Sequence, residues 1–166
     1  MKSPEVLIVM GSDSDLSVME EGAKILAEFG VPYEMRISSA HRSPRRTATL
    51  AAEASGRGIR VIIAGAGMAA HLAGVIAAET LLPVIGVPMG GGELDGLDAL
   101  YSTVQMPGGI PVATMAIGKA GAKNAGILAV QILALGNENL TNALTSYRES
   151  MAEAVAAKDA ALRAHD

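Results

Sequence analysis

Two of the three histidines of this chain lie in short polar stretches that follow runs of β-branched residues. His41 lies in SSAHR, residues 38–42, and His71 closes GAGMAAH, residues 65–71. Imidazole titrates near neutral pH, so it can take up and release a proton there. His41 is therefore a candidate general acid and base, with a surface or structural histidine as the alternative.

The stretch GSDSD, residues 11–15, could bind a phosphorylated ligand. Backbone amides at a helix start and the hydroxyls of Ser12 and Ser14 suit a phosphate. Asp15 would repel a phosphate, but its carboxylate accepts hydrogen bonds well from sugar hydroxyls. The alternative is helix capping, which the same residue types also perform. Neither GxGxxG nor GK[ST] follows the first strand, so this is not a Rossmann fingerprint or a P-loop.

Arg42 and Ser39 extend the candidate site. An arginine beside a helix start can bind a phosphate through two hydrogen bonds. The alternative is a surface ion pair with a carboxylate such as Glu34. His71 could bind a ligand, or it could only cap or pack against the helix that follows. Two histidines on different loops, with no cysteine and no HxxxH spacing, fall short of a metal ligand set.

Short β-branched runs alternate with alanine-rich helical stretches, which predicts an α/β doubly wound structure with a mainly parallel five-stranded sheet between two helical layers. The expected strands are residues 6–10, 33–37, 60–64, 83–87 and 111–117, and the expected helices between them lie within 16–30, 44–58, 71–80 and 95–105. Ligands of such sheets bind at the carboxyl ends of the strands. The turns 11–15, 38–42, 65–71 and 88–95 should therefore meet.

Helix boundaries support this reading. Ser43 before Pro44 predicts an N-cap followed by proline at the first helical position, and Gly30 and Gly58 stand where helices should end. A C-terminal helix is expected at about residues 138–164. Its apolar residues recur every three to four positions, which predicts a buried stripe packed on the domain or on a neighbouring subunit: Leu140, Leu144, Tyr147, Met151 and Val155.

Composition narrows the function classes. The 166 residues suit one domain, and with 50% hydrophobic and 18% charged residues there is little polar surface for a monomer, so we expect an oligomer. A net charge of −4 and few aromatic residues disfavour nucleic-acid binding. The chain has no cysteine, no signal-peptide core near its start and no apolar run long enough for a membrane span. We expect a cytoplasmic protein.

Taken together, the polar turns and several longer motifs resemble the bacterial N5-carboxyaminoimidazole ribonucleotide mutases of de novo purine synthesis, the class I PurE-type family. The motifs run in the family's order along nearly the whole chain: MGSDSDL (10–16), SAHRSP (39–44), VIIAGAG with AAHL (61–72), LPVIGVP (82–88), GLDALYSTVQMPGGIPVAT (96–114) and GKAG with KNAGILA (118–129). The animal-type branch, which carboxylates directly with carbon dioxide, usually has lysine after the histidine, whereas this chain has Arg42.

The resemblance implies a flavodoxin-like fold, a homo-octamer and a small ribonucleotide substrate. The carboxylate of that substrate moves from the exocyclic nitrogen to ring carbon 4 without ATP, biotin or a metal. By resemblance, His41 is the general acid and base, and Ser12, Asp15 and Arg42 match nucleotide-binding positions. Ser14, Ser39 and His71 are expected neighbours in the same pocket.

Two positions depart from the family pattern. Met68 replaces a glycine and Ala73 replaces a proline. If the backbone at position 68 needs a positive φ, methionine strains or moves the loop. Two alternatives to the mutase stay open: a direct aminoimidazole ribonucleotide carboxylase, and a non-catalytic paralogue that binds the nucleotide without turning it over.

Overall fold

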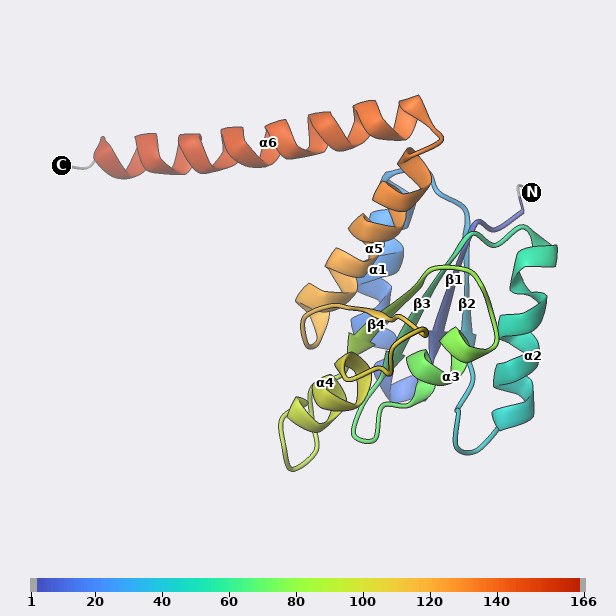
Figure 1. Cartoon of the computed structure of the whole chain (residues 1–166). Helices are drawn as coiled ribbons and strands as arrows, with labels where there is room; N and C mark the ends of the chain where they lie inside the picture. The colour runs from blue at the N-terminus through green and yellow to red at the C-terminus, as the bar shows by residue number, and fades with distance from the viewer. Residues whose placement is uncertain (1–2, 165–166) are drawn as a thin grey trace. The chain divides into compact units, whose positions relative to one another are not determined.

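Five parallel strands form one sheet in the order β2-β1-β3-β4-β5 (Figure 1). They are β1 (Val6–Met10), β2 (Tyr33–Ile37), β3 (Val61–Ala66), β4 (Val84–Pro88) and β5 (Ala113–Thr114). This computed structural model describes residues 3–164. The order 2-1-3-4-5 is that of flavodoxin-like proteins, so the predicted fold class is confirmed.

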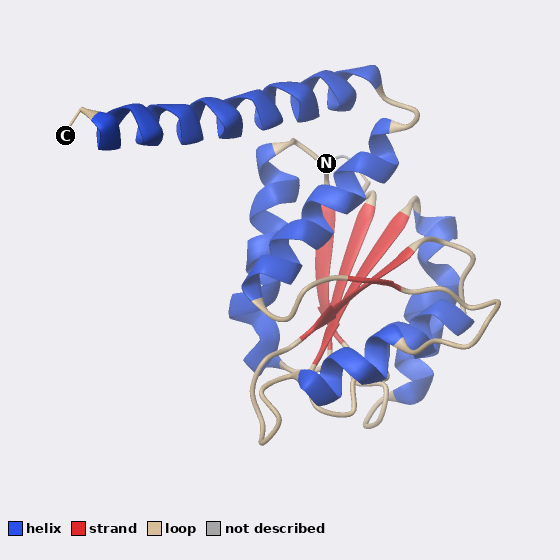
Figure 2. Ribbon diagram, turned by 60° about the vertical axis from the view of Figure 1, so that its left-hand side comes forward, coloured by secondary structure: helices blue, strands red, loops and turns tan. Residues whose placement is uncertain are grey.

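Helices cover both faces of the sheet (Figure 2). The helices described in the chain are α1 (Leu16–Glu28), α2 (Pro44–Ala54), α3 (Leu72–Ala78), α4 (Leu97–Val104), α5 (Lys119–Ala134) and α6 (Glu138–Arg163), with short 3₁₀ turns η1 (Asp13–Asp15) and η2 (Ser55–Arg57). Two chain reversals were predicted at glycines, and Gly30 and Gly58 there have φ values of +65° and +91°. Both are left-handed conformations that glycine adopts without a steric penalty.

Strand boundaries differ from the sequence prediction at three places. β3 continues through Gly65 because that residue pairs with Met10 on one side and Val87 on the other. β4 likewise extends to Pro88, which pairs with Ala66. The stretch 111–117 was predicted as a strand, but only Ala113–Thr114 pair. β5 has one neighbouring strand and follows a proline, which lacks the amide that a ladder needs.

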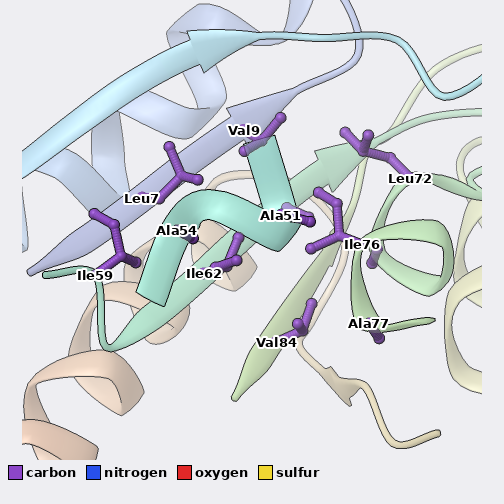
Figure 3. Packing of buried hydrophobic residues seen from close by; sticks show 12 residues of the cluster. Leu7, Val9, Ala51, Ala54, Ile59, Ile62, Leu72, Ile76, Ala77 and Val84 are labelled. Atoms are coloured by element: carbon purple, nitrogen blue, oxygen red, sulfur yellow. The ribbon is translucent and has the colours of Figure 1, made fainter. Parts of the chain in front are cut away.

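Successive side chains of a strand point to opposite faces of the sheet, so the buried core lies on both faces. Leu7 and Val9 of β1 point to the face that α2 and α3 cover (Figure 3). There they join a buried cluster of Ile62 and Val84 from the sheet and of small and branched side chains from the two helices: Ala51, Ala54, Leu72, Ala73, Ile76 and Ala77. The packing fixes α2 and α3, whose preceding loops carry the two candidate histidines.

On the opposite face α1 and α5 approach closely. A Cβ added to Gly22 would lie 2.8 Å from the carbonyl oxygen of Ala122, and one added to Gly126 would lie 2.8 Å from the carbonyl oxygen of Gly22. No real Cβ tolerates such a contact with backbone. These two glycines therefore set the spacing of α1 and α5, and so the placement of the GSDSD turn that begins α1.

The chain divides into two compact units, one ending at Val130 and one beginning at Gln131. The second unit contains α6, which matches the predicted helix at about 138–164. Asn137 caps it by accepting hydrogen bonds from the amides of Asn139 and Leu140. The packing of the apolar stripe of α6 on the domain or on a neighbouring subunit stays a prediction. Among residues 3–164, no helix is long and apolar enough to cross a membrane.

Candidate active site

The strand order reverses at β1, which lies between β2 and β3. Ile37 at the end of β2 and Gly65 near the end of β3 both pair with Met10. The loops that follow these strands therefore leave the sheet at the same level. In open α/β sheets this switch point is where ligands bind, because the two loops diverge and leave a crevice.

An open cavity of about 450 Å³ occupies this crevice. All seven predicted site residues line it: Ser12, Ser14, Asp15, Ser39, His41, Arg42 and His71. The lining also includes Met68, already noted as a departure from the family pattern, and residues that the sequence did not single out one by one: Gly11, Ala40, Ala66, Gly67, Ala69, Leu72, Met89, Gly90, Gly91 and Gly92. Small or apolar residues carry no chemical signal, and only their position at strand ends could have indicated them.

His41 and His71 form a hydrogen-bonded pair across the cavity. Nε2 of His41 lies 2.9 Å from Nδ1 of His71, and the rings meet edge to face at 81° with centroids 5.0 Å apart. A hydrogen bond between two imidazole nitrogens requires one of them to be unprotonated. His71 occupies the N-cap position of α3, but its side chain makes no capping hydrogen bond. The pair, and not helix capping, accounts for where its ring lies.

The SSAHR turn is held by its own serines. The Ser39 amide donates to Oγ of Ser43 at 3.0 Å, and the Ser43 hydroxyl donates to the Ser39 carbonyl at 3.0 Å. The Arg42 amide donates to Oγ of Ser39 at 3.1 Å. Ser43 does stand at the N-cap of α2, with Pro44 following, but its side chain makes no capping bond. The predicted N-cap position of Ser43 and the proline after it are confirmed, and the Ser43 hydroxyl is used by the turn.

Arg42 does not form the surface ion pair considered as its alternative role. Glu34 pairs instead with Arg57 and with Arg36, the latter at 3.4 Å. Within residues 3–164, no carboxylate lies within ion-pair distance of the exposed Arg42 guanidinium. A free cation on a cavity wall of an acidic protein is suited to an anionic ligand.

In the GSDSD turn, Ser12 stabilises the local backbone, whereas Asp15 lies on the cavity wall. Oγ of Ser12 accepts from the Ser14 amide at 3.3 Å and caps η1, as the capping alternative proposed. Asp15 stands at the N-cap of α1 without a capping bond. Burial raises the pKa of its carboxyl above the ordinary value, and hydrogen bonds from Ser14 and Ser12 oppose that shift. Asp15 is thus a partly buried acceptor on the cavity wall.

The loop after β3 has the strained backbone that its sequence suggested. Met68 has a φ of +54°, in the left-handed region that favours glycine. Across the cavity, Gly91 and Gly92 have φ values of +111° and +69°. These residues form a wall with few side chains, which leaves room for a ligand beside the histidine pair. No group of three potential metal-ligating residues occurs within the described part of the chain.

The fold and the cavity together define a doubly wound α/β protein with a ligand site at its switch point. Residues 5–154 match the AIR carboxylase family, and the chain belongs to that family.

Related proteins extend over nearly the whole chain. It is 54% identical over 160 residues to the N5-carboxyaminoimidazole ribonucleotide mutase of Mycobacterium tuberculosis, covering 96% of this chain and 91% of that protein. It is 58% identical over 158 residues to the phosphoribosylaminoimidazole carboxylase of Schizosaccharomyces pombe, but spans only 28% of that longer protein. The crystal structure of Treponema denticola PurE superposes with a TM-score of 0.86 at 31% identity, covering 95% of this chain and 97% of the other.

Proposed function

We propose that this protein is an N5-carboxyaminoimidazole ribonucleotide mutase of purine biosynthesis. The observation that carries the proposal is the His41–His71 pair at 2.9 Å, on the wall of a cavity that also holds the unpaired Arg42. The relative of similar length named above carries this activity in its name. The reaction is an isomerisation, so it needs a proton donor and acceptor and a closed pocket, and it consumes no second substrate.

His41 acts as the general acid and base. It first donates a proton to the carbamate nitrogen, which lets the carbon–nitrogen bond break and release carbon dioxide. The freed aminoimidazole is an enamine-like nucleophile, and its ring carbon 4 attacks the carbon dioxide. His41 then takes the proton from carbon 4, which restores the aromatic ring. One proton enters and one leaves, so the histidine ends in its starting state.

The hydrogen bond to His71 determines which ring nitrogen of His41 carries a proton. With Nε2 of His41 bonded to Nδ1 of His71, the other nitrogen of His41, Nδ1, is the one that meets the substrate. When His41 donates in this bond as a neutral ring, its Nδ1 is a bare base. When His71 donates, Nδ1 of His41 carries the proton, and His41 acts as an acid by taking the His71 proton at Nε2 as its Nδ1 proton leaves.

The remaining polar residues bind the nucleotide. Arg42 and the hydroxyls of Ser12 and Ser14 contact the phosphate. They place a cation and hydrogen-bond donors on the two turns that follow β1 and β2. Asp15 accepts hydrogen bonds from the ribose hydroxyls. Ser39 positions Arg42 through the turn hydrogen bond described above. The chemistry needs no metal or organic cofactor.

The enzyme works as a homo-octamer of single-domain subunits in the cytoplasm. A chain with 18% charged residues and several exposed large apolar side chains supports assembly. The absence of cysteine supports a reducing compartment. Nucleic acid and membrane are not partners in this proposal.

The decisive experiment mixes purified protein with the carbamate substrate, without ATP or bicarbonate, and follows the absorbance change of the ring. Conversion to the 4-carboxylate supports the mutase. Conversion of the unmodified ribonucleotide only when bicarbonate is added would make the protein a direct carboxylase. Nucleotide binding without turnover would indicate a non-catalytic paralogue and would contradict the proposal.

A further inference from the structure

Met68 places a large apolar side chain at a cavity that is otherwise lined by polar residues, by glycine and alanine, and by the buried Leu72 and Met89. Its side chain lines the cavity, yet the residue is 66% exposed. Only two non-glycine residues between positions 3 and 164 have a positive φ, namely Met68 and Asp95. A left-handed backbone at methionine is unfavourable, and such strain is typical of positions where a side chain is needed in one direction.

The direction of the Met68 side chain is given by its neighbour on the opposite loop. A Cβ built on Gly92 would lie 3.7 Å from Cγ of Met68, which is ordinary van der Waals contact. Met68 belongs to the loop between β3 and α3, and Gly92 belongs to the loop between β4 and α4. The thioether side chain therefore approaches the second loop across the part of the cavity wall that Gly90, Gly91 and Gly92 leave without side chains.

We propose that Met68 is a specificity-determining residue that packs on the base of the bound ribonucleotide and closes the cavity against Gly90–Gly92. This inference rests on the proposed function. The exposed thioether is flexible and polarizable, so it can adapt to a planar ring, and a ring placed against it removes apolar surface from water. Covering this side of the cavity also keeps the released carbon dioxide beside ring carbon 4 until recapture.

A footprinting experiment tests the contact without relying on turnover. Dilute hydrogen peroxide transfers one oxygen atom to a methionine sulfur and leaves as water, and mass spectrometry of peptides gives the rate at each methionine. Saturating aminoimidazole ribonucleotide should slow oxidation of Met68 by about tenfold, as expected when a ligand excludes solvent from a contacting group. Met35 is the internal reference, because it is only partly buried and does not line the cavity.

Unchanged oxidation of Met68 at saturating nucleotide overturns the inference, and so does a failure of the nucleotide to bind. Slower oxidation of Met68 alone supports it even if the wild-type protein does not convert the carbamate. Failure of the proposed function is thus distinguishable from failure of this inference.

Isotope retention tests the closure during turnover. The reaction is run from unlabelled carbamate in ¹³C-bicarbonate, and label in the product reports carbon dioxide that escaped and exchanged. Met68→Ala keeps a Cβ on the strained backbone but removes the thioether, whereas Met68→Gly removes both. Both variants should incorporate several times more label than wild type, and Met68→Leu should stay near wild type. Retention in Met68→Ala equal to that of wild type and of the control Met35→Ala would overturn the closure.

Discussion

At the scale of single residues, the histidine pair is the candidate acid and base of the cavity. The two rings come from loops that lie 30 positions apart in the chain and bond at 2.9 Å. Their residue type made them candidates in the sequence, but the bond between them depends on strand order and register. The candidate roles of the two histidines could therefore be proposed from the sequence, whereas the hydrogen bond between them is seen only in the structure.

Replacing His41 with asparagine should remove the proton transfer and keep the polar shape of the ring. We expect the mutase rate to fall by about a hundredfold to ten-thousandfold, the usual range for losing a general acid and base. Nucleotide affinity, measured by calorimetry, should stay within a few fold. A His41→Asn protein that turns over at the wild-type rate would show that another group transfers the proton.

Asp15 provides a prediction that depends on pH. Burial raises the pKa of its carboxyl in the folded state above the ordinary 3.8. The folded protein therefore binds more protons than the unfolded chain between 3.8 and the raised value, so stability falls as the pH rises through that interval. Asp15→Asn should melt above wild type at pH 7, and the difference should shrink as the pH approaches 3.8.

The same substitution should weaken substrate binding, because an uncharged amide accepts more weakly from the ribose hydroxyls. A rise in KM with little change in kcat is the expected signature. Asp13→Asn on the same turn is the matched control, since Asp13 does not line the cavity. Equal melting temperatures and equal KM values for both variants would contradict the role of Asp15.

At the scale of elements, close helix packing on one face of the sheet positions the GSDSD turn. Gly22→Ala would drive a Cβ to 2.8 Å from the Ala122 carbonyl oxygen, so α1 and α5 would have to separate. We expect a loss of about 1–3 kcal/mol in the free energy of unfolding, measured by urea denaturation.

Gly56→Ala is the control for this packing. No atom lies within 4 Å of a Cβ added there, and the φ of Gly56 is not among the positive values. Its stability should match or slightly exceed that of wild type, because alanine narrows the unfolded ensemble. If Gly22→Ala proves as stable as Gly56→Ala, the two helices do not need the contact.

Sequence patterns predicted some helices and strands more accurately than others. Buried β-branched runs predicted the central strands almost to the residue, because these strands are buried on both faces. The same pattern overstated β5, whose pairing depends on one neighbour, and it missed that Gly65 continues β3 through bonds to strands on both sides. It placed Ser43 correctly at the N-cap, but it did not indicate the local turn that uses the Ser43 hydroxyl.

At the scale of the whole molecule, apolar surface is left without a partner in the single chain. Leu81 is fully exposed, and the α4 residues Leu97, Tyr101 and Val104 lie at positions that share one helical face. The predicted apolar stripe of α6 adds Met151 and Val155, both exposed. Isolated exposed apolar residues are normal in monomers, but two such helices in one small protein support association.

Light scattering should therefore give a solution mass of eight times the 16.9 kDa chain. Assembly that involves α6 predicts that Val155→Asp shifts the mass towards smaller species, because a carboxylate is unfavourable in an apolar contact. Ala160→Asp, which adds the same carboxylate on the opposite face of α6, is the comparison. A wild-type protein of 16.9 kDa would contradict the oligomer.

The pairing of both Ile37 and Gly65 with Met10 affects how the cavity responds to local unfolding. β1 is flanked by strands on both sides, and all five of its residues are at most 1% exposed. Amide protons there should exchange with solvent only when the entire sheet opens, whereas amides of the surrounding loops exchange through local opening. The spacing between the two histidine loops is thus tied to the slowest-exchanging hydrogen bonds in the protein. The catalytic geometry should therefore persist on warming until the sheet itself unfolds.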